Sequence, residues 1–256
     1  MINTPKNTTL LTILLLSALG VGACADRGDS SPLPDFSIYT DVKQKKAAFF
    51  GYIFPLVEEQ NQLIKGHRGR LLGLVGTTVE TQEKADQKFI KELAGYYKVD
   101  TEKLNKTVID ALLLRVDQVP ASLALAQAAM ESAWGTSRFA VQGNNLFGQW
   151  CYQEGCGLVP LRRNPGTKHE VAKFDSVRDA IKSYLRNINT HRAYSDLRLH
   201  RATLRDQDQP VSGHLLADNL IEYSELREAY VHEIQAVIRI NKLAQYDSGL
   251  TRQASD

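Results

Sequence analysis

One almost wholly apolar stretch constrains the fold of this chain more than any other part of it. Between Ala121 and Ala133 (ASLALAQAAMESA) the sequence has a single charged residue, Glu131. Pro120 is suited to open a helix here, and Gly135 is a natural terminator. A helix that is apolar nearly all round is buried in a protein core. The sequence therefore predicts a buried central helix with one carboxylate in its last turn.

The position of Glu131 makes it a candidate general acid. Burial disfavours a charged carboxylate, and the negative end of the helix dipole does the same, so both raise its pKa. A protonated carboxyl group beside an aromatic residue such as Trp134 is what a glycosidase uses to protonate a glycosidic oxygen. From these residues alone, the alternative is that Glu131 pairs with a surface arginine and has no chemical role.

The periodicity of the rest of the chain predicts a predominantly helical α+β protein with one small β excursion after the central helix. Pro55 is expected to start or kink a turn in the first helix, and residues 67–76 look broken by glycines. Ser176 and Asp179 form a capping-box pattern before another helix. The expected helices are 41–65, 79–97, 101–116, 177–188, 196–205, 213–222 and 225–243, and the expected strands are 157–162 and 170–174.

The N-terminus has the pattern of an export signal. Lys6 precedes an apolar run, Leu10 to Leu19, that is short for a membrane span, and small residues and Cys24 follow it. We predict a signal peptide of the lipoprotein type over residues 1–23, with Cys24 as the lipid-bearing residue. The alternative is an ordinary signal peptide with an incidental cysteine.

Residues 24–40 are polar and contain proline and glycine, so we expect a flexible tether. Ala25 follows Cys24 where the usual inner-membrane retention signal has aspartate. The resemblance to bacterial lipoproteins therefore implies an outer-membrane lipid anchor and a location at the periplasmic face of the cell envelope.

Cys151 and Cys156 lie close together in CYQEGC. In an exported protein this spacing favours a short-loop disulfide over two free thiols. A metal site would need more ligands than His169 can add, so we expect no metal.

Composition excludes several classes of function. The 256 residues have a formal net charge of +2, and the basic residues are spread along the chain, so we expect no nucleic-acid partner. The sequence has no glycine motif of the phosphate-binding kind, and we expect no cofactor.

Two blocks, AQAAMESAWGTSRFA and GNNLFGQW, carry a family resemblance. They resemble the catalytic motif of bacterial N-acetylglucosaminidases of glycoside hydrolase family 73, in the same order and at similar spacing. The segments KKAAFFGYIFPLVEEQNQLI and NTHRAYSDLR are similar to the Bax-type subfamily of proteobacterial proteins. The resemblance extends over about residues 41–241.

This resemblance implies a lysozyme-like, two-lobed fold that cleaves peptidoglycan glycan strands with Glu131 as the general acid. We expect a helical N-terminal layer over 41–115, the glucosaminidase domain over 116–244, a frayed tail over 245–256, and a monomer. Two alternatives stay open, a lytic transglycosylase of similar fold and a catalytically silent peptidoglycan-binding lipoprotein.

The family pattern also implies a second acid and a tyrosine in the cleft. For the acid, Glu170 is preferred over Glu154, and an acid on the opposite face of the sugar would imply inversion. If neither acts, the N-acetyl group of the substrate is the remaining source of assistance. For the tyrosine, Tyr223 is the better match and Tyr230 is the alternative.

Several residues of the two blocks and the segment that follows are expected to bind substrate. The aromatic ones are suited to stack on sugar rings, and the asparagines to bind N-acetyl groups, although core packing and turn formation are their ordinary roles. The expected substrate-binding residues are Trp134, Ser137, Asn144, Asn145, Phe147 and Trp150.

Overall fold

The protein has a predominantly helical α+β fold with a small antiparallel sheet. The computed structural model describes residues 32–77, 82–101, 106–161, 166–221 and 228–250. The predicted signal peptide and Cys24 lie outside these residues. Within the described ranges, no helix combines the length and the apolar character needed to cross a membrane.

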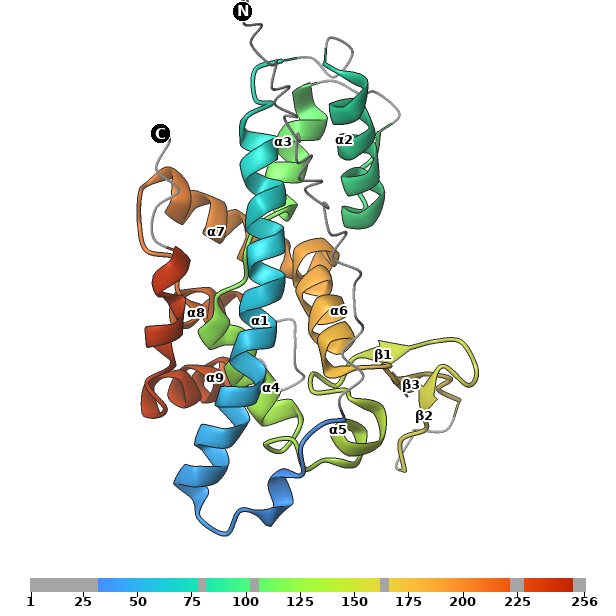
Figure 1. Ribbon diagram of the computed structural model, residues 1–256, viewed down its shortest axis with the longest axis vertical. Coiled ribbons are helices and arrows are strands. Elements are labelled where there is room, and N and C mark those ends of the chain that lie inside the picture. The colour runs from blue at the N-terminus through green and yellow to red at the C-terminus, as the bar shows by residue number, and fades with distance from the viewer. Residues whose placement is uncertain (1–31, 78–81, 102–105, 162–165, 222–227, 251–256) are drawn as a thin grey trace, which may run out of the picture.

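The longest element is α1, Val42–Leu72, which runs along the length of the molecule (Figure 1). Asp41 caps it by accepting a hydrogen bond from the Gln44 amide at 2.8 Å. The prediction that the helix would end at residue 65 is wrong, because the following glycines remain helical. The helix also continues through Pro55. Pro55 and Gly51 are both exposed, so water can solvate the carbonyl that loses its partner.

Two helices, α2 (Lys84–Tyr97) and α3 (Lys106–Arg115), pack beside the upper part of α1 (Figure 1). The Arg115 guanidinium donates to the carbonyls of Tyr97 and Lys98, at 2.8 and 3.0 Å. It therefore ties the end of α2 to the end of α3. Together with α1, these helices lie within residues 41–115.

The apolar stretch forms α4, Ala121–Glu131, with Pro120 as its N-cap. Every residue from Ala121 to Ala129 is buried, as predicted for a helix without a polar face. It packs against α1, α8 (Gly213–Leu216), α9 (Glu228–Ile240) and the 3-10 helix η5 (Leu243–Leu250). Gly213 allows the close approach of α8, since a Cβ atom there would lie 2.2 Å from Ser122 Oγ.

The described parts of two segments that we expected to be loose, residues 32–40 and 245–250, are ordered against this core. The predicted tether, 24–40, ends in the 3-10 helix η1 (Phe36–Ile38), and Phe36 is buried against Phe49 with ring centroids 5.3 Å apart. The predicted frayed tail, 245–256, is helical up to Leu250. Both expectations failed because apolar side chains, Phe36 and Tyr246, find partners in α1.

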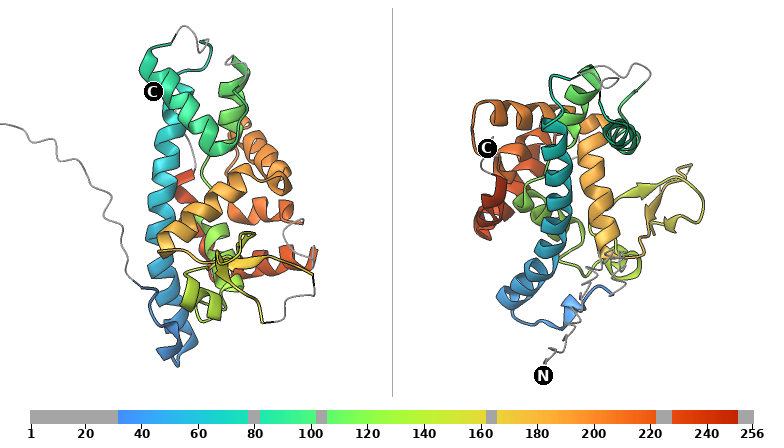
Figure 2. Two further views of the ribbon diagram at one scale, coloured as in Figure 1. Left: turned by 90° about the vertical axis from the view of Figure 1, so that its right-hand side faces the viewer. Right: turned by 45° about the horizontal axis from the view of Figure 1, so that its top comes forward.

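A three-stranded antiparallel sheet projects from the helical body beyond α6 (Figures 1 and 2). The strand order is β1 (Trp150–Cys151), β3 (Glu170–Ala172), β2 (Gly157–Leu158), and Val171 pairs with both Trp150 and Leu158. A short helix that we did not predict, α5 (Arg138–Gly143), precedes the sheet.

Helix α6, Val177–Thr190, lies between the sheet and the rest of the body (Figure 1). Its capping box is confirmed, because Ser176 Oγ accepts from the Asp179 amide at 3.1 Å. The 3-10 helix η3 (Arg192–Tyr194), α7 (Ser195–Asp206) and the 3-10 helix η4 (Ala217–Asn219) complete the helical part.

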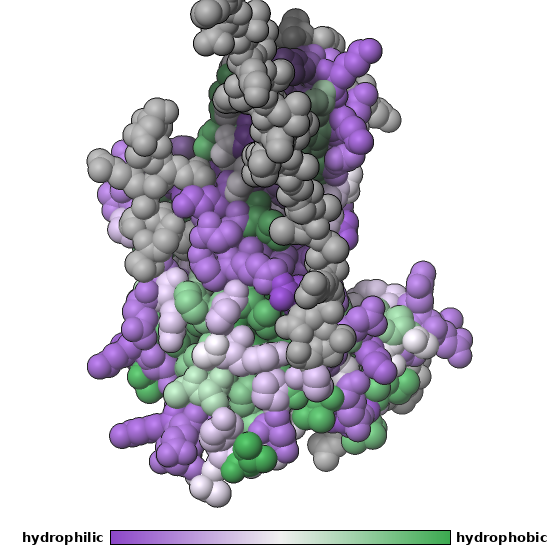
Figure 3. All heavy atoms as spheres, viewed as in Figure 1, coloured by the Kyte–Doolittle hydropathy of each residue, from purple (hydrophilic) through white to green (hydrophobic). Residues whose placement is uncertain are grey.

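The surface seen in Figure 3 changes in character along α1. Hydrophilic residues gather over the middle of the helix, whereas hydrophilic and hydrophobic residues are mixed over its lower part.

Candidate active site

Glu131 is the last residue of α4, and its side chain is half-buried. Its Oε1 accepts a hydrogen bond from Tyr230 Oη at 2.9 Å. Burial raises the pKa of Glu131 above its ordinary value, and the hydrogen bond from Tyr230 offsets part of this effect. No charged side chain of the described residues contributes to the shift. A surface arginine therefore does not neutralise this carboxylate within the described ranges.

Tyr230 belongs to a buried relay of hydrogen bonds. Tyr184 Oη donates to Gln127 Oε1 at 2.6 Å, Gln127 Nε2 donates to Tyr230 Oη at 2.9 Å, and Tyr230 then donates to Glu131. Because each hydroxyl has one proton, this order fixes the direction of every bond. The relay holds Glu131 Oε1 as an acceptor and leaves Oε2 as the oxygen that can carry a proton.

Glu131 Oε2 faces Gly148. A Cβ atom at Gly148 would lie 3.6 Å from Oε2, and the backbone of this glycine is left-handed (φ +62°). Oε2 has no hydrogen-bond partner among the described residues. The two sequence blocks, one ending α4 and the other containing Asn-Leu-Phe-Gly, therefore meet in space at the carboxylate.

The chain after Glu131 makes an unusually strained turn. Ala133, Trp134 and Gly135 all have positive φ, at 50°, 60° and 76°. Ser132 holds the turn, because its Oγ donates to the Ala128 carbonyl at 2.5 Å and accepts from the Gly135 amide at 2.8 Å. Left-handed backbone at non-glycine residues costs about 1–2 kcal/mol per residue, and such strain clusters at functional sites.

The structure gives packing contacts to Trp134, which we expected to bind sugar. Its ring meets Phe49 and Phe50 edge-on at 5.8 and 5.4 Å, and Lys46 Nζ lies 4.8 Å from the ring centroid. These contacts fix the strained turn against α1. They do not include Glu131, so the structure does not bear out the expectation that Trp134 shades the carboxylate.

Four other expected substrate-binding residues have structural partners. Ser137 caps α5, and the Asn144 amide donates to the Phe174 carbonyl at 2.9 Å. Asn145 is buried and uses both ends of its amide on backbone groups of residues 147, 149 and 172. Phe147 is 2% exposed and stacks on Tyr184 with centroids 3.9 Å apart. Burial leaves Asn145 and Phe147 no surface for a sugar, which corrects the expectation for both.

Trp150 is the expected sugar-binding residue that remains accessible. It is 57% exposed on β1, and one face of its ring stacks on His169 with centroids 4.0 Å apart. The disulfide predicted between Cys151 and Cys156 is confirmed directly beside it. The small sheet therefore presents an exposed aromatic ring directly beside the loop that the disulfide closes.

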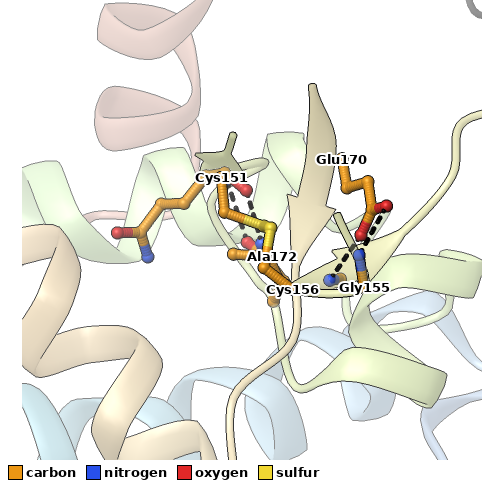
Figure 4. The surroundings of a disulfide bond; sticks show 8 residues. Cys151, Gly155, Cys156, Glu170 and Ala172 are labelled. Atoms are coloured by element: carbon orange, nitrogen blue, oxygen red, sulfur yellow. Dashed lines mark hydrogen bonds between the residues drawn. A yellow bond between two sulfur atoms is a disulfide. The ribbon is translucent and has the colours of Figure 1, made fainter. Parts of the chain in front are cut away.

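Glu170 supports that loop (Figure 4). Its side chain is 6% exposed, and its Oε1 and Oε2 accept from the Gly155 and Gly157 amides at 3.0 and 2.8 Å. A carboxylate engaged in this way is not free to activate water, so its contacts favour a structural role over the predicted second acid. Glu154 is exposed on the loop, and Tyr223, the preferred cleft tyrosine, lies outside the described residues.

Cys151, Cys156 and Glu170 are also the only group of three candidate metal ligands found within the described ranges. Their sulfur atoms are bonded to each other, and the carboxylate is held by two amides. This group therefore does not offer the free thiolates that a metal site needs.

Sequence reasoning missed the roles of Gln127 and Tyr184. Gln127 lies four residues before Glu131 and so shares its helix face, and a polar residue inside an apolar helix must find a partner. That pairing was a usable signal in the sequence. Nothing in the sequence indicated that Tyr184, which fits the core face of α6, would complete the relay.

Comparison with known proteins agrees with the two sequence blocks. The glucosaminidase family model, described as mannosyl-glycoprotein endo-β-N-acetylglucosaminidase, matches residues 111–243. The chain belongs to the glucosaminidase family. It is 34% identical to Protein bax of Escherichia coli (strain K12) over 215 residues, which cover 83% of this chain and 76% of that protein. The resemblance to Bax-type members is thus confirmed, and no solved structure matches the chain.

The matched region of the family includes Glu131, the relay and the sheet, and its bounds lie close to those we predicted, 116–244. Membership supports a glycosidase-like enzyme. The lysozyme-like comparison of the fold stays a prediction.

Proposed function

We propose that this protein is a peptidoglycan hydrolase, an endo-β-N-acetylglucosaminidase that uses Glu131 as its general acid. The observation that carries the proposal is the half-buried carboxyl of Glu131, with a raised pKa and with Oε2 free beside Gly148. Membership of the glucosaminidase family supports the reaction class.

In the proposed reaction, protonated Glu131 donates from Oε2 to the glycosidic oxygen as the bond to the anomeric carbon breaks. The departing sugar leaves as an alcohol, and positive charge develops on the ring that remains. The Tyr230 hydrogen bond to Oε1 stabilises the carboxylate that has lost its proton. The hydrogen bonds that Glu170 accepts from the Gly155 and Gly157 amides make it a poor second acid, so we propose that the N-acetyl oxygen of the substrate attacks the anomeric carbon as the leaving sugar departs. Water then attacks the same carbon, the bond to the N-acetyl oxygen breaks, and the Glu131 carboxylate takes a proton from the water.

The products test this proposal. Purified sacculi treated with the protein should release fragments with reducing N-acetylglucosamine ends, and Glu131→Gln should release none. Glu92→Gln is the matched control, because Glu92 is exposed on α2 and its substitution removes the same charge. Retention at the anomeric carbon is expected with assistance by the N-acetyl group, whereas inversion would point to an unassigned carboxylate. Undiminished release by Glu131→Gln would overturn the assignment.

One observation favours a second candidate, the lytic transglycosylase. The described residues place no second carboxylate at Glu131, and a single acid that later acts as a base is enough for intramolecular ring closure. Such a reaction would give anhydro-muramic ends, which mass spectrometry separates from reducing ends. Binding to sacculi without any release would instead indicate a silent peptidoglycan-binding protein.

We also propose that Cys24 is acylated and anchors the protein to the outer membrane, at its periplasmic face. The apolar run before Cys24 supports export, and the Cys151–Cys156 disulfide is typical of proteins in oxidising compartments. Intact mass measurement of the mature protein should show a lipid on Cys24. Cys24→Ala should release the protein from membranes, and an unchanged membrane fraction would contradict the anchor.

A further inference from the structure

A polar hollow lies beside α6 and is lined by none of the residues of the Glu131 relay. It has a volume of about 220 Å³ and is enclosed by the end of α2, by β1 and by one face of α6. Lys98, Trp150, Arg186 and Asn187 contribute to its lining. None of these residues belongs to the hydrogen-bond relay, so the hollow is a feature separate from the acid.

The hollow has unmatched positive charge. Arg186 Nε donates to the Tyr96 carbonyl at 2.9 Å, and its guanidinium lies 4.6 Å from the centroid of the Tyr96 ring. These contacts fix the guanidinium but leave its two terminal nitrogens without a protein partner among the described residues. The Lys98 amino group and the Asn187 amide are likewise unpaired there, and no described acidic side chain lines the hollow. A fixed guanidinium fork beside an ammonium group is suited to a carboxylate.

Trp150 adds an apolar wall to this charged hollow. One face of its ring is covered by His169, which does not line the hollow, so the ring offers its remaining surface. A ligand that matches both features has a carboxylate next to small apolar groups. A short peptide has this character, whereas a bare neutral sugar lacks the charge.

A short segment of chain joins the hollow to the carboxyl of Glu131. Gly148 faces Oε2 of Glu131, and Trp150, which lines the hollow, follows two residues later, so the two sites are separated by at most about 7 Å of backbone. The side chain of Gln149 holds this segment to α6, since it donates to the Ala180 carbonyl at 2.9 Å and accepts from Ser183 at 2.8 Å. A substituent on a sugar bound at Glu131 can therefore reach the hollow.

We propose that this hollow binds a carboxylate of the peptide substituents on the glycan strand. The proposal rests on the proposed function, and it adds that the protein prefers glycan whose peptides carry free carboxylates over neutral glycan without peptides. Arg186 and Lys98 bind the carboxylate, and Trp150 packs against the peptide chain.

Binding by the inactive Glu131→Gln protein tests this selection without cleavage. Calorimetry with soluble oligomers should show about tenfold tighter binding for glycan that carries peptides than for bare N-acetylglucosamine oligomers, which have no carboxylate, and the difference should shrink with salt. Amidation of the peptide carboxylates should abolish the preference. Equal affinity for all three oligomers would overturn the proposal.

Lys98→Asn is the informative second substitution. Lys98 is the C-cap of α2 with φ 56°, a conformation that asparagine adopts readily, so the fold should tolerate the change. It should weaken binding of peptide-bearing oligomers about threefold to fivefold and leave binding of the bare ones unchanged. Lys91→Gln, which removes the same charge from an exposed position on α2, is the control and should change neither. An equal loss for both oligomers on Lys98→Asn would contradict the assignment.

Cleavage by the wild-type protein separates this proposal from the proposed function. If the protein cleaves bare and peptide-bearing strands at equal efficiency, and Lys98→Asn alters neither, the selection is refuted and the hydrolase stands. If it cleaves neither but still binds peptide-bearing oligomers more tightly, the hydrolase assignment fails and the binding site stands.

Discussion

Asp117, which is buried, and Glu131, which is half-buried, lie at opposite ends of the segment that contains α4, and the charges around them differ. Asp117 is 2% exposed and pairs with Arg205 at 2.6 Å, Arg201 at 3.5 Å and Arg68 at 3.7 Å. Burial alone would raise the pKa of Asp117, but the three arginines together lower it. Among the described residues, Glu131 has one hydrogen-bond partner, the neutral Tyr230, and its pKa is raised.

This difference distinguishes an acid held ionised by ion pairs from an acid whose pKa is raised by burial. The three arginines keep Asp117 ionised, and they also bind the backbone before α4, since Arg201 donates to the carbonyls of Asp117 and Gln118. Glu131 is placed so that it can hold and release a proton. The segment that leads into α4 is therefore held by ion pairs. The C-terminal end of α4 carries an acid that has no countercharge among the described residues.

The largest expected effect is that of Glu131→Gln on activity. Loss of the acid should lower kcat on glycan oligomers by about 10⁴-fold, at the upper end of what general acid catalysis contributes.

The Glu131→Gln protein should be more stable than the wild type, although it is less active. Because the folded-state pKa of Glu131 is raised, ionisation destabilises the fold as pH rises from the ordinary carboxyl pKa through the folded one. Glu131→Gln should therefore raise the melting temperature at pH 8 and much less at pH 4. A lower melting temperature at pH 8 would contradict the uncompensated charge.

Asp117→Asn should destabilise the protein by about 3–5 kcal/mol, because it leaves the buried arginines without their shared carboxylate. Denaturant unfolding at pH 7 measures this change. Asp110→Asn is the matched control, since Asp110 is exposed on α3, and it should change stability by less than about 0.5 kcal/mol. Equal effects of the two substitutions would show that the arginine cluster does not depend on Asp117.

Glu170→Gln should cost about 1–3 kcal/mol of stability, because a carboxylate that accepts two amides is lost from the disulfide loop. Activity should fall by less than about tenfold. A loss as deep as that of Glu131→Gln, in a protein of unchanged stability, would instead assign Glu170 as the second catalytic acid.

Tyr230→Phe should have the smallest effect, a loss of about tenfold in kcat or about 1.4 kcal/mol. The Tyr230 hydrogen bond lowers the pKa of Glu131, so its removal should raise that pKa further. Activity that requires protonated Glu131 should then persist to higher pH, which a pH–rate profile measures. Tyr246→Phe is the control: it removes a tyrosine hydroxyl on η5, keeps the ring that contacts Phe54, and should leave the profile unchanged.

The sequence was sufficient for much of the fold around α4. Continuous apolar residues predicted its burial, the Ser176 capping box predicted α6, and the cysteine spacing predicted the disulfide. Local patterns failed where long-range contacts decide the outcome. The tail that begins at Gln245 is polar in sequence, yet its described part is helical. Its conformation depends on the hydrogen bonds that Ser122 donates to Asp247 and on the ring contact between Tyr246 and Phe54.

Prediction of the site divided in the same way. The raised pKa expected for Glu131 is present, because burial at the end of an apolar helix suffices to raise it, whereas its role as the general acid stays a prediction. Asn145 and Phe147 were mistaken for substrate-binding residues because a motif shows which residues a turn requires but not which way they point. Tyr230 was assigned second place because only the three-dimensional packing of α9 on α4 brings its hydroxyl to Oε1.

The hydrogen bonds of Asp247 have a consequence for the order in which the enzyme is completed. Its carboxylate accepts hydrogen bonds from the Ser122 amide at 2.9 Å, from Ser122 Oγ at 2.6 Å and from the Gly213 amide at 3.0 Å. A residue 125 positions downstream of Ser122 therefore caps an amide in the first turn of α4. A chain made from its N-terminus carries α4 without this cap until Asp247 has been synthesised. The Tyr230 that holds Glu131 is also made late. The surroundings of Glu131 are therefore complete only after synthesis has passed both residues, and a shorter nascent chain lacks the Tyr230 hydrogen bond to Oε1.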